Sequence, residues 1–110
     1  MATADWMRYW GWGDARALPI GPDAGIDVEA SGAVAQVKAH MVPVGRPDVQ
    51  NLYGVAHAKG VQALFFALTS YTRQAQEWAN EHEVALFRFD LQGEPAPVNG
   101  HAQKVVEGTQ

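Results

Sequence analysis

Residues 26–39 read IDVEASGAVAQVKA, and two runs of alternating apolar and polar side chains flank a central Ser-Gly pair. This pattern predicts a β-hairpin with its turn at the Ser-Gly pair. A period of two puts Gln36 and Lys38 on the same face of the second strand. Asp27, on the first strand, is expected to lie close to opposite Gln36 or Lys38. The hairpin therefore brings together an acid, a second oxygen ligand and a lysine.

Helix and strand patterns alternate outward from the hairpin. The apolar spacing predicts helices at residues 4–10, 47–59, 72–81 and 100–106, and further strands at 15–20, 61–68 and 84–89. Alternation in the second half indicates parallel strands joined by crossover helices, whereas the first half is a meander. The expected fold class is α/β, with a mixed β-sheet flanked by helices on both faces.

Polar and glycine residues mark the ends of these helices. Thr3 is expected to cap the first helix, either Ser70 or Thr72 the third, and Asn99 the last. Gly60 is expected to end the second helix.

Composition limits the class of protein. The chain has 110 residues, so we expect one domain over residues 1–110. It contains no cysteine, which excludes disulfides and cysteine-based zinc sites. The formal net charge of −4 argues against a general nucleic-acid coating protein, but an enzyme can concentrate a few basic side chains on one face. The start of the chain does not read as a signal peptide, and the apolar run at 63–68 is too short to cross a bilayer, so we expect a cytoplasmic protein without a membrane partner.

The hairpin residues suit phosphodiester hydrolysis. A hard divalent cation prefers oxygen ligands, lowers the pKa of a bound water and stabilises charge on phosphate. A nearby lysine can position the attacking water or stabilise the developing charge. Acid and lysine pairs are also common on solvated hairpins. Here the apolar neighbours of Lys38 predict a mostly buried strand, where an unpaired lysine is costly, so Asp27 and Lys38 form either an ion pair or a site.

Five blocks of the sequence together resemble the Mrr-type restriction endonuclease domain. In chain order they are GIDV (25–28), AQVK (35–38), VGRPDVQNLYG (44–54), LFFALTSYT (64–72) and AQEWA (75–79). The resemblance covers roughly residues 5–90. It implies a PD-(D/E)xK-superfamily nuclease core in which glutamine stands where most relatives have glutamate.

The resemblance also implies roles for individual residues. Asp27 would be the metal-binding aspartate, Gln36 the second ligand or its substitute, and Lys38 the catalytic lysine. The carbonyl of Val37 would complete the inner shell around Mg²⁺ or Mn²⁺. Family members often place another acid in the first helix, and Asp5 is the candidate in this chain.

Other residues are accessory candidates. Gln36 brings no charge, so this site would hold Mg²⁺ less tightly than two carboxylates would. Glu29 is either a compensating acid or a solvated edge acid. Gln50 is either a site residue or a surface glutamine. Five basic residues could contact phosphates or be plain surface charges: Arg16, His40, Arg46, Lys59 and Arg73.

These observations lead to one function and two rivals. We expect a metal-dependent DNA endonuclease that works as a homodimer or with a partner protein, since duplex cleavage needs two active centres. One rival is a resolvase-like nuclease acting on branched DNA. The other is a catalytically inactive DNA- or protein-binding regulator on the same fold, favoured by the acidic charge and by Gln36.

Overall fold

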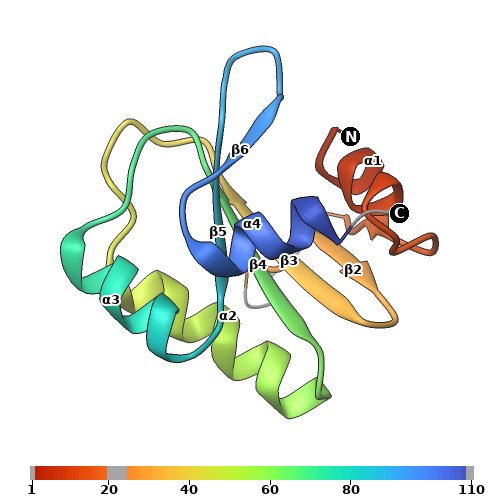
Figure 1. Cartoon of the computed structure of the whole chain (residues 1–110), viewed down its shortest axis with the longest axis horizontal. Helices are drawn as coiled ribbons and strands as arrows, with labels where there is room; N and C mark the ends of the chain where they lie inside the picture. The colour runs from red at the N-terminus through yellow and green to blue at the C-terminus, as the bar shows by residue number, and fades with distance from the viewer. Residues whose placement is uncertain (1, 20–24, 109–110) are drawn as a thin grey trace.

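The computed structural model describes residues 2–19 and 25–108. These residues form a six-stranded mixed sheet in the order β1-β2-β3-β4-β5-β6, covered by helices (Figure 1). The helices are α1 (Ala2–Tyr9), α2 (Arg46–Lys59), α3 (Arg73–Glu81) and α4 (Gly100–Glu107). The strands are β1 (Arg16–Ala17), β2 (Val28–Ala30), β3 (Ala33–Lys38), β4 (Gln62–Ala67), β5 (Ala85–Phe89) and β6 (Pro95–Pro97).

The sheet combines a meander with crossover connections, as the alternation of patterns predicts. Strands β1, β2 and β3 pair antiparallel, and Val28 lies opposite Ala35 in the hairpin. Strands β3, β4 and β5 are parallel, with α2 and α3 as the crossovers. Strand β6 returns antiparallel to β5. The expected mixed α/β sheet is confirmed.

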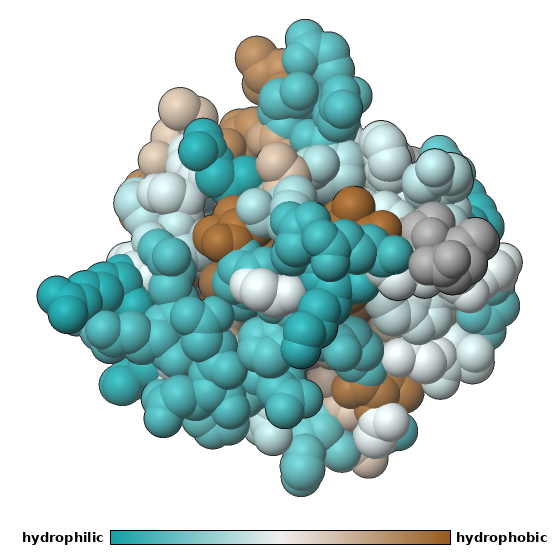
Figure 2. Space-filling view, in the orientation of Figure 1, coloured by the Kyte–Doolittle hydropathy of each residue, from teal (hydrophilic) through white to brown (hydrophobic). Residues whose placement is uncertain are grey.

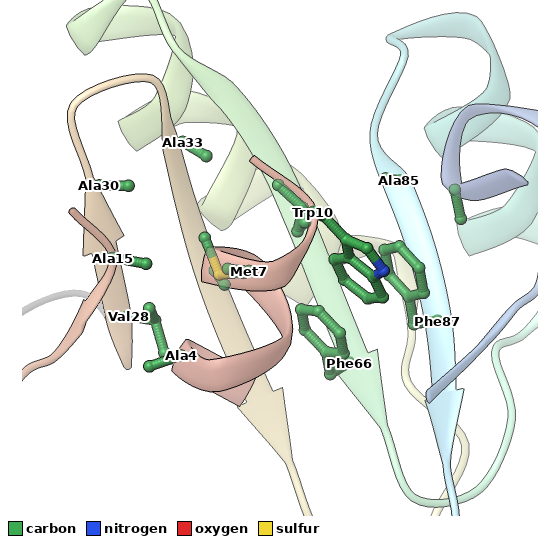
Figure 3. Packing of buried hydrophobic residues seen from close by; sticks show 13 residues of the cluster. Ala4, Met7, Trp10, Ala15, Val28, Ala30, Ala33, Phe66, Ala85 and Phe87 are labelled. Atoms are coloured by element: carbon green, nitrogen blue, oxygen red, sulfur yellow. The ribbon is translucent and has the colours of Figure 1, made fainter. Parts of the chain in front are cut away.

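Helices α1 and α4 cover one face of the sheet. Met7 of α1, Trp10 directly after α1 and Ala102 of α4 are buried against alternate residues of the central strands. The rings of Trp10 and Phe87 stack with centroids 5.0 Å apart, and those of Phe66 and Phe87 stack at 4.7 Å (Figure 3). The face of the molecule seen in Figure 2 is mostly hydrophilic, with a few hydrophobic patches. Buried residues alternate with exposed ones along α1 and α4, so each helix buries only one face.

Helices α2 and α3 cover the opposite face. Leu52 of α2 and Ala75 of α3 are fully buried there with Phe65 of β4 and Leu86 of β5. Tyr71 precedes α3, and the single proton of its buried hydroxyl is shared between the carbonyl oxygens of Phe65 and Phe87, at 2.9 Å and 2.6 Å. Burial raises the pKa of this hydroxyl. Tyr71 therefore ties the start of α3 to two central strands.

Three of the predicted helix ends are confirmed. Gly60 ends α2 in the left-handed conformation, with φ at 69°. The side chain of Thr72 accepts a hydrogen bond from the Ala75 N–H at 3.1 Å. Asn99 accepts from the Ala102 N–H at 3.0 Å, and it also accepts from the Leu86 N–H, so it joins α4 to β5.

Other predictions are wrong or incomplete. Thr3 lies inside α1 with a buried side chain instead of capping it, because the helix already begins at Ala2. Of the strand expected at 15–20, only β1 forms a regular strand. The Leu18 N–H adds one bond to the Asp27 carbonyl, and residue 20 lies outside the described part of the chain. The sequence did not predict β6, because two prolines mark its ends. An edge strand tolerates proline, which cannot donate to a ladder. Within residues 2–19 and 25–108, no helix is long and apolar enough to cross a membrane.

Candidate active site

Asp27 directly precedes Val28, the first residue of β2, and bridges two peptide groups of β3. Its N–H donates to the carbonyl of Ala35 at 2.9 Å, and its Oδ2 accepts from the N–H of Val37 at 2.7 Å. The two bonds fall on either side of Gln36. Asp27 therefore lies alongside Gln36, one of the two positions that the hairpin pattern predicts, and its carboxylate is held by the β3 backbone.

Gln36 is buried, with only 6% of its surface exposed. Its Oε1 atom has no hydrogen-bond partner within the described residues. Its amide packs against Gly25, where an added Cβ would come within 2.7 Å of Nε2. Gly25 also has φ at 76°, a conformation that favours glycine. A buried, unpaired amide oxygen costs about 1–3 kcal/mol, so Gln36 is an unusual residue for a purely structural position.

Gln36 and Lys38 face the same cavity, which confirms that they share one face of β3. The cavity has a volume of about 810 Å³ and lies between β3 and α2. Gln50, predicted as an accessory residue, lines it as well. Asp27 is not among the lining residues. It remains joined to Val37, the residue between Gln36 and Lys38.

Helix α2 contributes further lining residues that sequence reasoning did not identify as part of a site. They are Asp48, Asn51, Gly54, Val55 and Ala58. Their spacing of three or four residues places them on one helical face, which is the signal that could have indicated them. That signal becomes informative only once α2 is known to cross over β3.

An oxygen-ligated cation fits this arrangement. In a β-strand the N–H and the C=O of one residue point to the same edge. Since the Val37 N–H points toward Asp27, the Val37 carbonyl lies on that same edge. The second carboxylate oxygen of Asp27 has no protein donor in the described part of the chain, and Oε1 of Gln36 is also unpaired. Residues 2–19 and 25–108 contain no cluster of three or more histidine, cysteine or acidic side chains. Any cation here would therefore be held by carboxylates together with amide and backbone oxygens.

Two acids predicted as accessories have other partners. Asp5 of α1 is exposed and forms an ion pair with Arg8, and α1 covers the face opposite Gln36 and Lys38. Glu29 pairs with Arg16 at 3.1 Å and with Lys59 at 3.5 Å. The structure does not bring either acid together with Gln36 and Lys38.

The basic candidates occupy different positions. Arg73 is exposed and pairs with Glu77 one turn along α3. Lys59 lines the cavity as well as pairing with Glu29. His40 follows β3 two residues beyond Lys38, and Arg46 is the first residue of α2, and both are exposed. His40 and Arg46 are therefore near the end of β3 that carries Lys38.

A comparison with protein families assigns this architecture. The sequence model of the Mrr catalytic domain, described as a restriction endonuclease, matches residues 2–91. The chain belongs to the Mrr-type restriction endonuclease family. Its hairpin, with Asp27, Gln36 and Lys38, and its helices α1 to α3 all fall within the match. No curated protein and no solved structure is matched.

The family match indicates that this Mrr-type domain is a restriction-endonuclease-like nuclease. Strand β6 and helix α4 follow the matched residues and complete the sheet and its helical cover.

Proposed function

We propose that this Mrr-type domain is a metal-dependent DNA endonuclease whose active centre is formed by Asp27, Gln36 and Lys38. The observation that carries the proposal is the pairing of Asp27 Oδ2 with the Val37 N–H at 2.7 Å. This bond fixes a carboxylate on the strand that presents Gln36 and Lys38 to one cavity. Family membership supports the reaction class.

Asp27, Gln36 and the Val37 carbonyl are the proposed ligands of Mg²⁺ or Mn²⁺. The cation would supply an acidified water and charge stabilisation at the scissile phosphate. The chain contributes rigidity, because Asp27 is held by two β3 peptide groups and the Gln36 amide is packed against Gly25. Fixed ligands need little reorganisation when substrate binds.

Lys38 is the proposed catalytic lysine. It is half-buried at the end of β3 and lines the cavity beside Gln36. None of the ion pairs recorded for the described residues involves Lys38. Its ammonium group is therefore available to orient the attacking water or to stabilise charge on the phosphate.

DNA is the proposed substrate, with His40 and Arg46 as phosphate contacts close to Lys38. Phosphate contacts of this kind position a strand without reading its sequence. Arg16 and Arg73 are weaker candidates because each already pairs with a glutamate. Cleavage of both strands of a duplex requires two such centres, so we propose a homodimer or a complex with a partner protein.

A cleavage assay with a panel of substrates tests the proposal. Purified protein is incubated with linear, supercoiled, methylated and four-way-junction DNA while Mg²⁺ or Mn²⁺ is titrated. Cleavage of linear or plasmid DNA supports the endonuclease, and cleavage confined to the junction supports a resolvase-like activity. Absence of metal-dependent cleavage of all four substrates contradicts the enzyme and favours a binding or regulatory protein.

A further inference from the structure

Asp48 is an acidic side chain in the cavity that no part of the proposed centre uses. It lies in the first turn of α2, it is half-buried, and it lines the same cavity as Gln36 and Lys38. Each of the four ion pairs recorded for residues 2–19 and 25–108 joins other residues. Asp48 thus places a carboxylate at the cavity wall without a basic partner in the described part of the chain.

The run of α2 along β3 places Asp48 near Lys38. The two elements run in opposite directions, because α2 is the crossover between two parallel strands. At one end, Lys59 pairs with Glu29, which lies opposite Val34 of β3. Lys38 lies four residues beyond Val34 along β3, which is about 13 Å. Counted back from Lys59 along α2, the same distance corresponds to about nine residues. The first turns of α2, which contain Asp48, are therefore level with Lys38.

The charges in the cavity leave room for a second acid. Lys59 also lines the cavity, but its charge is balanced by its ion pair with Glu29. Asp27 and Lys38 cancel each other, and Gln36 is neutral, so a divalent cation bound there would leave two positive charges. Asp48 reduces this excess to one, and one substrate phosphate would neutralise the remainder. The buried and unpaired Oε1 of Gln36 is an independent sign that this wall of the cavity accommodates a ligand.

We infer that Asp48 is the second carboxylate of the cation site and supplies, from α2, the negative charge that Gln36 lacks. This inference rests on the proposed metal-dependent function. It explains how a site with glutamine in place of an acid retains a divalent ion. A ligand set with two carboxylates suits Mg²⁺ and Mn²⁺ better than a set with one carboxylate and neutral amides.

Mn²⁺ binding, measured by calorimetry and by the electron paramagnetic resonance signal of free Mn²⁺, tests the inference without DNA. The proteins are the wild type, Asp48→Asn, Asp27→Asn, and Glu77→Gln. The last variant removes the same charge from the outer surface of α3. Circular dichroism and a thermal melt establish that each variant is folded.

We expect Asp48→Asn to weaken Mn²⁺ binding by about tenfold or more, because ligand losses at metal sites are at least as severe as the loss of their supporting partners. Glu77→Gln should bind as the wild type does. The double variant Asp48→Asn with Gln36→Glu should recover much of the affinity, since it returns the second carboxylate from β3.

The outcomes separate this inference from the proposed function. If Asp48→Asn binds Mn²⁺ like the wild type while Asp27→Asn does not bind it, the role of Asp48 is overturned and the metal-dependent centre stands. If the wild type binds no Mn²⁺ and cleaves no DNA, both are overturned. Equal weakening by Glu77→Gln also overturns the role of Asp48, because the effect would then reflect net charge.

Discussion

The carboxylate Oδ2 of Asp27 accepts a hydrogen bond from the Val37 N–H at 2.7 Å. This bond links the start of β2 to the strand that carries Gln36 and Lys38. It gives Asp27 a structural role next to its proposed role as a cation ligand, and the two roles can be separated by substitution.

Asp27→Ala should destabilise the fold, whereas Asp27→Asn should do so much less. Alanine leaves the Val37 N–H without its partner, at a cost of about 1–2 kcal/mol, while the asparagine amide oxygen can still accept the bond. Urea unfolding of the two variants measures the difference. Equal stability of both variants would show that the Val37 bond contributes little.

Gly54→Ala should stabilise the protein. Gly54 is in the middle of α2, and nothing lies within 4 Å of an added Cβ. Alanine is favoured over glycine in a helix interior by about 0.5–1 kcal/mol. The increase in stability is measured as a higher urea concentration at the unfolding midpoint, with an unchanged dependence of the free energy of unfolding on urea concentration. A lower midpoint would show that α2 needs the glycine for a contact or a backbone conformation.

Tyr71→Phe should change the alkaline stability of the fold. Burial raises the pKa of Tyr71, so the folded chain keeps its proton at a pH where the unfolded chain has lost it. The stabilising effect is complete below the ordinary tyrosine pKa of about 10 and is lost as the pH rises above it, by about 1.4 kcal/mol per pH unit. Unfolding of the wild type and the variant between about pH 9 and pH 11 measures this.

The Tyr71→Phe variant should start less stable, because it loses the bonds to the Phe65 and Phe87 carbonyls, and it should decline less steeply. Parallel declines in the two proteins would contradict the assigned role of Tyr71.

Local signals in the sequence predicted much of the fold. Asn99 and Gly60 were predicted, and Thr72 was one of two predicted alternatives, because caps depend on residues a few positions apart. The hairpin was identified because strand alternation and its turn are contiguous. Strand β6 was missed because its prolines usually interrupt strands, and its edge position becomes known only from the complete sheet.

In the candidate site, too, local features could be predicted from the sequence and contacts between distant elements could not. Gln36 and Lys38 share a strand, so a period of two was enough to place them together. Asp48 became a candidate only when α2 was seen to pack over β3. The partners of Glu29 could not be predicted either, because Lys59 reaches it from another element.

Single-turnover cleavage of the DNA substrate found in the panel, with saturating Mn²⁺, is the most direct test of the central claim. The proteins compared are the wild type, Lys38→Met, Asp27→Asn and Glu77→Gln. Methionine keeps the apolar stem of Lys38 and removes its charge. The account predicts wild-type rates for Glu77→Gln and losses of about a hundredfold or more for Lys38→Met and Asp27→Asn. Cleavage by Lys38→Met and Asp27→Asn at the wild-type rate would contradict it.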